Sequence, residues 1–243
     1  MATPLHFSVE VESVERHTPD VATFHLAWRD RRPRFRPGQF VQVALDRYDP
    51  GSHWPESRPF SIASAPGDPH GMRLTISRQG PFTGRMLAEA TPGRRLSCKG
   101  PYGDFVIGEG VRGHRIILIA GGTGITPFCA FLEASLVGPS VAPAPATLYY
   151  GARTPELLVY RALAERWAGS VRGAETHLWS EREAAGGIAA GRLDIALIAG
   201  RENPVGPCCY FLSGPSSMIV GFRDRLEGQF QVPSSLIRVD HWQ

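Results

Sequence analysis

Lysine is almost absent from this sequence. Lys99 is the only lysine among 243 residues, so the formal net charge of +3 comes from arginine, and a charge this small gives no ground for nucleic-acid binding. The four cysteines, Cys98, Cys129, Cys208 and Cys209, form no C-x-x-C pair and no iron–sulfur spacing. This pattern argues against a built-in ferredoxin-type cluster, and it is typical of a protein in the reducing cytoplasm.

Long apolar runs are missing as well. No stretch approaches the roughly 18 consecutive apolar residues of a membrane-spanning helix. The segment from Met1 to Val11 lacks the charged region followed by an apolar one that marks a signal peptide. The 42% hydrophobic and 20% charged residues are typical of a soluble globular protein. The length leaves room for one large domain or two of ordinary size.

Short segments separated by turns fill the first part of the chain. Alternating or β-branched patterns predict six strands, at His6–Glu12, Val21–Trp28, Gln39–Leu45, Arg58–Ser64, Met72–Arg78 and Arg94–Lys99. Turns rich in proline and glycine lie between them. One helix is expected at Phe82–Ala90, ended by Thr91-Pro92-Gly93. Six strands of this kind predict a small antiparallel β-barrel over residues 1–110.

A different pattern begins after about residue 112. Apolar strands alternate with helices. The strands are expected at Ile116–Ala120, Ala146–Tyr150, Glu175–Trp179, Tyr210–Leu212 and Ile237–Asp240. The helices are expected at 127–136, Pro155–Ala168 and Pro215–Glu227. This alternation predicts an α/β domain with a parallel sheet over residues 111–243. We expect the boundary near Gly108–Gly113, and Pro139–Pro145 reads as a loop.

The stretch Ile116 to Phe128 is the strongest single indication of function. A short, buried strand is followed by Gly121, Gly122 and Gly124 and then by Pro127, which suits the first turn of a helix. Backbone N–H groups and the positive end of a helix dipole then point to one place, which suits a phosphate. The spacing is G-x-G-x-x-P, without the third glycine of the dinucleotide fingerprint, so a tight connection without a ligand is the alternative.

The barrel carries a second candidate site in Arg58-Pro59-Phe60-Ser61. An arginine can bind phosphate, an aromatic ring can stack on a flat ligand, and a serine can hydrogen-bond a ring nitrogen. Strand alternation places Arg58 and Phe60 on one face and Ser61 on the other. Further along, Gly80-Pro81-Phe82-Thr83 opens the predicted helix, and Thr83 with the amides there could hold a second phosphate.

Six short motifs in this order identify a family. They are Arg58-Pro59-Phe60-Ser61, Gly80-x-Phe82-Thr83, Gly100-Pro101-Tyr102-Gly103-Asp104-Phe105, Gly121-Gly122-Thr123-Gly124-Ile125-Thr126-Pro127, Tyr150-Gly151-Ala152-Arg153 and Ser213-Gly214-Pro215-x-x-Met218. Together they resemble the ferredoxin–NADP reductase family of flavin-dependent NAD(P)H oxidoreductases. The resemblance runs from about Phe7 to Trp242. It implies a flavin-binding barrel followed by an NAD(P)-binding domain, with hydride passing from nicotinamide to flavin N5.

The resemblance also implies residue roles on the flavin side, with FAD as the expected cofactor. Arg58 would pair with the flavin pyrophosphate, Phe60 would lie against the isoalloxazine ring, and Ser61 would bond near N5. Ile76 and Ser77 lie on the strand that would line the flavin side chain. Thr83 and its neighbours Gly80 and Phe82 would bind the flavin phosphate.

Further roles are implied on the nucleotide side. Gly121 to Pro127, with Thr123 and Thr126, would carry the pyrophosphate of the pyridine nucleotide. Arg153 would lie near the adenosine half, whereas Gly214, Pro215 and Met218 would lie near the nicotinamide.

Two departures from the family pattern stand near the expected nicotinamide site. Ser213 replaces a cysteine that many members have, so hydride transfer is expected to be slower. The ending Asp240-His241-Trp242 resembles a shortened form of the usual acidic residue and aromatic, with Asp240 as a proton relay and Trp242 shielding the flavin, or as packing only. Cys208 and Cys209 are read as buried strand residues, with a vicinal redox pair as the alternative.

Ser180-Glu181-Arg182 bears on the choice between NADPH and NADH. Ser180 and Arg182 offer a hydroxyl and a guanidinium to a 2′-phosphate, which favours NADPH. Glu181 could instead accept hydrogen bonds from ribose hydroxyls and favour NADH. A solvated loop would explain the same three residues.

Three functions remain open on the sequence alone. The first is a reductase that passes electrons to a separate acceptor such as a ferredoxin or an oxygenase component. An arginine cluster at Arg29, Arg31, Arg32, Arg34 and Arg36 could dock an acidic partner of this kind, or be a solvated loop. The second is a reductase of free flavin, which would bind flavin only loosely. The presence of both Arg58 and Thr83 as phosphate-binding residues argues against it. The third is a non-catalytic flavin- or nucleotide-sensing subunit.

Overall fold

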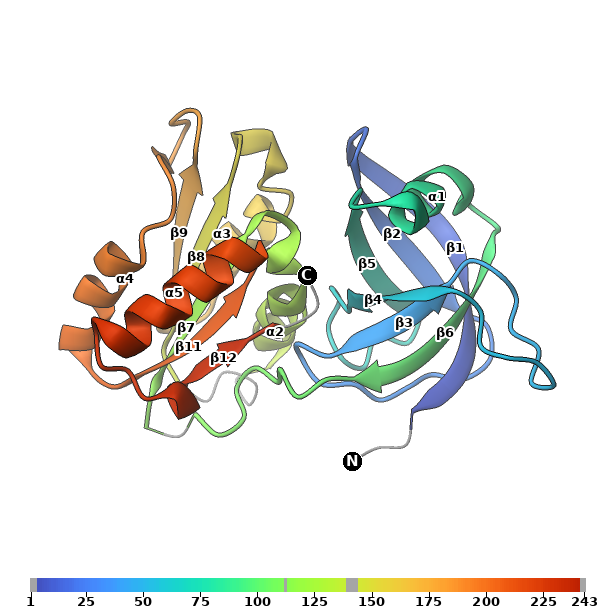
Figure 1. Ribbon diagram of the computed structural model, residues 1–243, viewed down its shortest axis with the longest axis horizontal. Helices are drawn as coiled ribbons and strands as arrows, with labels where there is room; N and C mark the ends of the chain where they lie inside the picture. Colours follow the sequence, from blue (N-terminus) through green and yellow to red (C-terminus); the bar gives the residue numbers. More distant parts are fainter. Residues whose placement is uncertain (1–3, 112, 139–143, 241–243) are drawn as a thin grey trace. The chain divides into compact units, whose positions relative to one another are not determined.

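The computed structural model describes residues 4–111, 113–138 and 144–240, and it divides into two compact units, Met1–Val106 and Ile107–Gln243. Each unit has its own sheet, as the ribbon in Figure 1 shows, and its own core. The expected fold class, an antiparallel barrel-like sheet followed by a parallel α/β sheet, is confirmed. The expected loop at Pro139–Pro145 falls largely on residues 139–143, which lie outside the described residues, and so does Trp242.

The first unit is built on a six-stranded antiparallel sheet in the order β4-β3-β6-β1-β2-β5. Its strands are β1 (Leu5–Thr18), β2 (Val21–Trp28), β3 (Phe40–Ala44), β4 (Ser57–Ser61), β5 (Gly71–Ser77) and β6 (Arg95–Tyr102). All six lie close to the segments predicted from alternation. β1 extends further than predicted, because its pairing with β2 continues through two irregularities in register.

Alternation of apolar side chains along these strands creates the core of the first unit. Val9, Phe24, Leu74 and Leu96 are each buried to 2% exposure or less, and they belong to one cluster. Helix α1 (Pro81–Glu89) adds buried side chains to the same cluster, including Phe82 and Met86. Burial of this apolar surface holds α1 against the sheet.

The two edge strands of this sheet, β4 and β5, approach one another at one end. The Ala63 N–H donates to the Arg73 carbonyl at 2.8 Å, just after β4 ends and near the start of β5. The sheet therefore curls toward closure beside Ser61. Antiparallel counting from this bond places Ser61 opposite Thr75.

The second unit is built on a parallel sheet in the order β10-β9-β8-β7-β11-β12. Its strands are β7 (Arg115–Gly121), β8 (Ala146–Ala152), β9 (Ala174–Ser180), β10 (Ile188–Ala190), β11 (Cys208–Ser213) and β12 (Ile237–Val239). β7 is completely buried along Ile116–Ala120, as expected for a strand covered on both faces.

Helices cover both faces of this sheet (Figure 1). α2 (Thr126–Val137) and α3 (Arg161–Ser170) lie on one face, and α4 (Ile195–Glu202) and α5 (Ser216–Gly228) lie on the other. No helix among the described residues is long and apolar enough to cross a membrane.

One sequence prediction in this unit needs correction, and two elements were missed. The predicted helix Pro155–Ala168 is a short 3₁₀ turn, Pro155–Leu157, followed by α3, because Leu158 turns inward with non-helical dihedrals and is buried. Strand β10 and helix α4 were not predicted. β10 has only three residues, which leaves little local pattern, whereas α4 begins after Asp194, a capping residue whose side chain accepts from the Ala196 N–H.

Candidate functional site

The order of strands in the second sheet creates a topological switch point between β7 and β11. From β7 the chain adds β8, β9 and β10 on one side, and then returns to add β11 and β12 on the other. In open parallel sheets, ligands bind outside the carboxyl ends of the strands at such a point. The segments that follow β7 and β11 here begin at Gly122 and Gly214, which both belong to predicted motifs.

Three glycines let these two loops touch. A methyl group on Gly124 would lie 2.5 Å from the carbonyl carbon of Ser213 and 2.6 Å from the α-carbon of Gly214. One on Gly121 would lie 2.8 Å from Cδ of Pro215 and 3.0 Å from Sδ of Met218. Two motifs that are far apart in the sequence therefore form one unit, which we call the glycine seam (Gly121, Gly124, Ser213, Gly214 and Pro215).

The start of α2 gives this seam donors for an anion. Gly122 has φ +57°, and nothing lies within 4 Å of where its β-carbon would be, so the backbone there is open. A 3₁₀ turn, Gly122–Ile125, leads into α2, with Pro127 in its first turn. The Thr126 hydroxyl donates to the Thr123 carbonyl at 2.9 Å. The turn's first N–H groups have no carbonyl within the helix to bind, which suits a pyrophosphate.

Ser213 and Asp240 meet beside the glycine seam. Ser213 Oγ donates to Asp240 Oδ2 at 3.0 Å, and the Asp240 N–H donates to the Leu212 carbonyl at 2.9 Å. Ser213 is fully buried and Asp240 is 4% exposed. Two residues predicted separately as catalytic thus form one hydrogen-bonded pair, with Asp240 held one residue beyond β12. Trp242 cannot be placed, because it lies outside the described residues.

The carboxyl ends of β8 and β9 bring together the residues predicted for the adenosine half. The Glu181 N–H donates to the Ala152 carbonyl at 2.9 Å, and the Arg182 N–H donates to the Arg153 carbonyl at 3.2 Å. Arg153, Glu181 and Arg182 are exposed. Their side chains therefore start from neighbouring points on one edge of the sheet.

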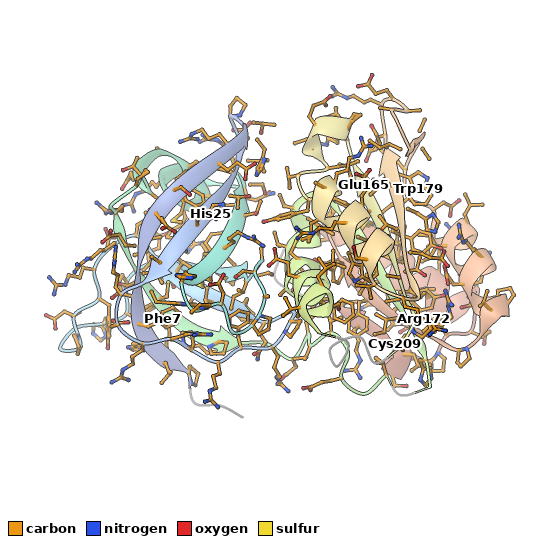
Figure 2. All side chains as sticks on the ribbon, turned by 180° about the vertical axis from the view of Figure 1, so that it is seen from behind. Phe7, His25, Glu165, Arg172, Trp179 and Cys209 are labelled. Atoms are coloured by element: carbon orange, nitrogen blue, oxygen red, sulfur yellow. The ribbon has the colours of Figure 1, made fainter. Side chains whose placement is uncertain are left out.

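Ser180 differs from these neighbours. It is fully buried, and its hydroxyl has no hydrogen-bond partner within the part of the chain that the structure describes. Figure 2 labels Trp179, the residue before it on β9. A buried hydroxyl without a partner is destabilising by about 1–3 kcal/mol. Ser180 is thus less accessible to a 2′-phosphate than Arg182. Its role in binding that phosphate stays a prediction.

On the first unit, Arg58 lies beside the beginning of α1. Its guanidinium carbon is 5.2 Å from the ring centre of Phe82, the second residue of that helix. Nη1 donates to the Ser57 carbonyl at 2.8 Å, and Nη2 is 3.0 Å from Glu56 Oε1. Phe60 also packs near Phe82, at 6.4 Å between ring centres. Arg58 and Phe60 both contact Phe82, so they lie on the same face of β4, as strand alternation predicts.

The Thr83 hydroxyl is used inside the protein. It accepts from the N–H groups of Gln79 and Gly80 at 2.8 and 3.0 Å, and it donates to the Gly80 carbonyl at 3.1 Å. These bonds cap α1. An anion beside Arg58 would therefore meet the backbone N–H groups of the first turn rather than this hydroxyl.

Ser61, Ile76 and Ser77 lie on the two edge strands of the first sheet, β4 and β5, which approach one another near Ser61. Ser61 is half-buried at the end of β4, and Ser77 is half-buried at the end of β5. The side chain of Ile76 is 1% exposed and belongs to the core, so only its backbone could line a ligand.

The cysteines are placed as buried side chains. All four are free and buried, and Figure 2 labels Cys209 within β11. Burial raises the pKa of Cys208 to about 11, and it also raises the pKa of Cys209. Both thiols stay protonated at neutral pH, whereas the thiolate is the reactive form of cysteine. This favours the reading as buried strand residues over the alternative of a vicinal redox pair.

The arginine cluster forms a loop that is fixed at several points. Arg29 Nη2 is 2.6 Å from Glu10 Oε1, Arg32 donates to the Gly67 carbonyl, and Phe35 is buried in the first core. All five arginines of the cluster are nevertheless exposed. The loop therefore presents positive charge from a fixed backbone.

Two residues near these sites were not found from the sequence. Glu56 pairs with Arg58. Arg192 Nε lies 3.1 Å from Glu181 Oε2. Arg192 comes close only because β10 returns the chain to the end of β9, and β10 was not predicted. The only signal for Glu56 in the sequence was its charge, two residues before Arg58.

Comparison with known proteins finds relatives over both units of the chain. Residues 118–224 match the family described as "Oxidoreductase NAD-binding domain". The ferredoxin–NAD(+) reductase component of the alkene monooxygenase system of Xanthobacter autotrophicus is 30% identical over 216 residues, covering 86% of this chain and 62% of that protein. The reductase component of propane 2-monooxygenase of Rhodococcus jostii is 29% identical over 228 residues, covering 89% and 58%.

The fold has a full-length counterpart among solved structures. A ferredoxin NADP+ reductase from Neisseria gonorrhoeae with bound FAD and NADP gives a TM-score of 0.76 at 16% identity, with 99% of each chain covered. The chain spans between 32% and 62% of the length of four curated relatives that it matches.

Proposed function

We propose that this chain belongs to the ferredoxin–NADP reductase family and is an NAD(P)H-dependent flavoprotein reductase. It would pass hydride from nicotinamide to bound FAD and then pass electrons to a separate acceptor. The observation that carries the proposal is the glycine seam at the switch point of the second sheet, with the buried Ser213–Asp240 pair beside it. A phosphate-binding turn and a polar pair at one strand end are what a nicotinamide dinucleotide requires.

The first unit fits a flavin phosphate. Arg58 supplies a guanidinium, α1 supplies N–H groups, and nothing lies within 4 Å of where a β-carbon of Gly80 would be. Bound FAD would supply the ability to accept two electrons and to release them singly. Phe60 would lie against the flat ring system. Ser61 would hydrogen-bond near N5 and help to fix the ring's orientation.

The second unit would hold the dinucleotide and shield its reactive end. Gly121 to Pro127 would bind the pyrophosphate through backbone N–H groups, and Arg153 would lie near the adenosine half. Gly214, Pro215 and Met218 would pack at the nicotinamide end. There the Asp240 carboxylate orients the Ser213 hydroxyl, so that this hydroxyl keeps one position beside the ring.

Asp240→Asn is expected to slow reduction of the flavin by NADPH by roughly 10- to 100-fold, with little change in nucleotide affinity. The reason is that the amide can donate as well as accept, so the Ser213 hydroxyl no longer has one fixed direction, and small displacements in a site can cost about 100-fold. Anaerobic stopped-flow absorbance would measure the rate constant.

Asp224→Asn, on the exposed surface of α5, is the matched control and should leave that rate unchanged. An Asp240→Asn variant with the wild-type rate would remove Asp240 from the proposed site.

NADPH is the proposed electron donor, with NADH as the alternative. Arg182 and Arg153 are exposed at one strand edge and place two positive charges where a 2′-phosphate would lie. Glu181 starts from the same edge, and its negative charge would repel a 2′-phosphate unless that charge is compensated.

The proposed acceptor is an acidic protein such as a ferredoxin or an oxygenase component. The two relatives described above are, by their names, reductase components of monooxygenase systems. The arginine cluster gives this chain a fixed, positively charged loop that complements an acidic surface. We also propose a cytoplasmic location, because free, buried thiols suit a reducing compartment.

An anaerobic titration of the purified protein with NADPH, and separately with NADH, tests the proposal. We expect a yellow protein whose flavin absorbance is bleached by one equivalent of NADPH. Bleaching by NADH alone would keep the reductase and reverse the choice of donor.

Two other outcomes would contradict the proposal. A yellow protein that neither nucleotide reduces would indicate a sensing subunit. A colourless protein that oxidises NADPH only when flavin is added would indicate a free-flavin reductase.

A further inference from the structure

The carboxyl ends of β8, β9 and β10 form one edge of the second sheet. Ala152, Ser180 and Ala190 are in register there, and the residues that follow each strand carry charge. Arg153 follows β8, Glu181 and Arg182 follow β9, and Arg192 follows β10 by two residues. Glu181 therefore stands among three arginines at this edge, and a second glutamate, Glu183, follows Arg182.

Glu181 and Arg192 form an ion pair across the edge. Arg192 Nε lies 3.1 Å from Glu181 Oε2, and their side chains are 83% and 38% exposed. The pair is open to solvent, so it adds little to the stability of the fold. Its chemical effect is on Glu181, whose carboxylate is occupied by a guanidinium.

The backbone around Arg192 is fixed although its side chain is exposed. Gly191 has φ +115°, and its N–H donates to the Ser180 carbonyl at 2.8 Å, which turns the chain back at the end of β9. On the other side, Leu193 packs so closely on Gly151 that a methyl group there would lie 2.8 Å from Leu193 Cγ. Arg192 therefore starts from one defined position beside Glu181.

An unpaired carboxylate at this edge would have two effects on a dinucleotide. It would accept hydrogen bonds from the ribose hydroxyls of NADH, and it would repel the 2′-phosphate of NADPH. A carboxylate held by Arg192 does neither of these well, because its charge is compensated and its oxygen is occupied.

We propose that Arg192 determines specificity by holding Glu181, so that the site accepts a ribose that carries a 2′-phosphate. This inference rests on the proposed dinucleotide site of the second unit. It assigns to Arg192 a positioning role that acts through Glu181, and it explains how an acidic residue can stand between Ser180 and Arg182 in a site that accepts NADPH.

The test uses the flavin-loaded protein and two nucleotide fragments, 2′,5′-ADP and 5′-AMP, whose affinities are measured by calorimetric titration. The ratio of the two affinities reports the 2′-phosphate alone and does not depend on catalysis. Arg192→Gln is expected to lower the preference for 2′,5′-ADP by roughly tenfold, because a positive charge is lost and a negative one is released.

Glu181→Gln separates the proposed role from direct contact. If Arg192 acts through Glu181, the double variant Arg192→Gln with Glu181→Gln should recover most of the wild-type preference. Arg172→Gln is the matched control. Arg172 is an exposed arginine just before β9, and Figure 2 shows it at the opposite end of that strand from Trp179. This variant should keep the wild-type preference.

Three results would overturn the inference. An unchanged preference in Arg192→Gln would show that Arg192 has no part in it. An equal loss in the single and double variants would show that Arg192 binds the phosphate directly. If neither fragment binds the wild-type protein, the proposed dinucleotide site fails, and this inference fails with it.

Discussion

Glu202→Ala is expected to lower the free energy of unfolding by about 3–5 kcal/mol, the usual cost of removing one partner of a buried ion pair. Glu202 ends α4 and is 1% exposed. Its Oε2 lies 3.1 Å from Nη2 of Arg115, and its Oε1 accepts from the Tyr149 hydroxyl at 2.5 Å. The variant leaves a guanidinium and a buried hydroxyl without this carboxylate. Urea unfolding followed by tryptophan fluorescence would measure the change.

Two further variants make this result specific. Glu202→Gln keeps the shape and an oxygen for one of the two donors, so it should lose less than Glu202→Ala. Glu165→Ala removes only an exposed pair with Arg161 on α3 and should cost about 0.3–0.5 kcal/mol. Equal losses for Glu202→Ala and Glu165→Ala would show that the buried network contributes nothing beyond a surface pair.

Gly124→Ala is expected to reduce the free energy of unfolding by about 2–3 kcal/mol and to weaken binding of NADPH. The added methyl group would lie 2.5 Å from the Ser213 carbonyl carbon and 2.6 Å from the Gly214 α-carbon. Both are backbone atoms, so the two strand ends must move apart, and overpacking of this kind usually costs about 1–3 kcal/mol. Unfolding in urea and titration with NADPH would measure the two effects.

Gly221→Ala is the matched control for this substitution. Gly221 lies within α5, and nothing is within 4 Å of where its β-carbon would be. Alanine there should stabilise the protein by about 0.5–1 kcal/mol. If Gly124→Ala were as stable as the wild type and bound NADPH equally well, the contact between the two loops would not exist as described.

Much of the fold could be predicted from the sequence because its local patterns are strong. Alternation fixed the strands of the first sheet to within a few residues, apart from the extension of β1. The apolar run at Ile116–Ala120 and the glycines after it predicted the central strand and the turn of the second sheet. Most residues of the candidate site were proposed from short motifs, and their roles stay predictions.

The contacts between those members could not be predicted. The bond between Ser213 and Asp240 joins residues 27 positions apart, and it depends on β11 and β12 being neighbours. Local patterns do not encode such pairing. Nor could the sequence show that the Thr83 hydroxyl is used in a cap, because a threonine at the third position of a helix suits a cap and a phosphate equally well.

That cap has a consequence for how the protein would acquire its cofactor. Thr83 holds the N–H groups of Gln79 and Gly80 through hydrogen bonds within the protein, and these bonds stabilise the beginning of α1. A cofactor that binds there would bind a preorganised surface, so the protein would lose little conformational entropy on association. The first unit would then release and regain its flavin without local refolding, so apoprotein made by removing the flavin should be readily reconstituted.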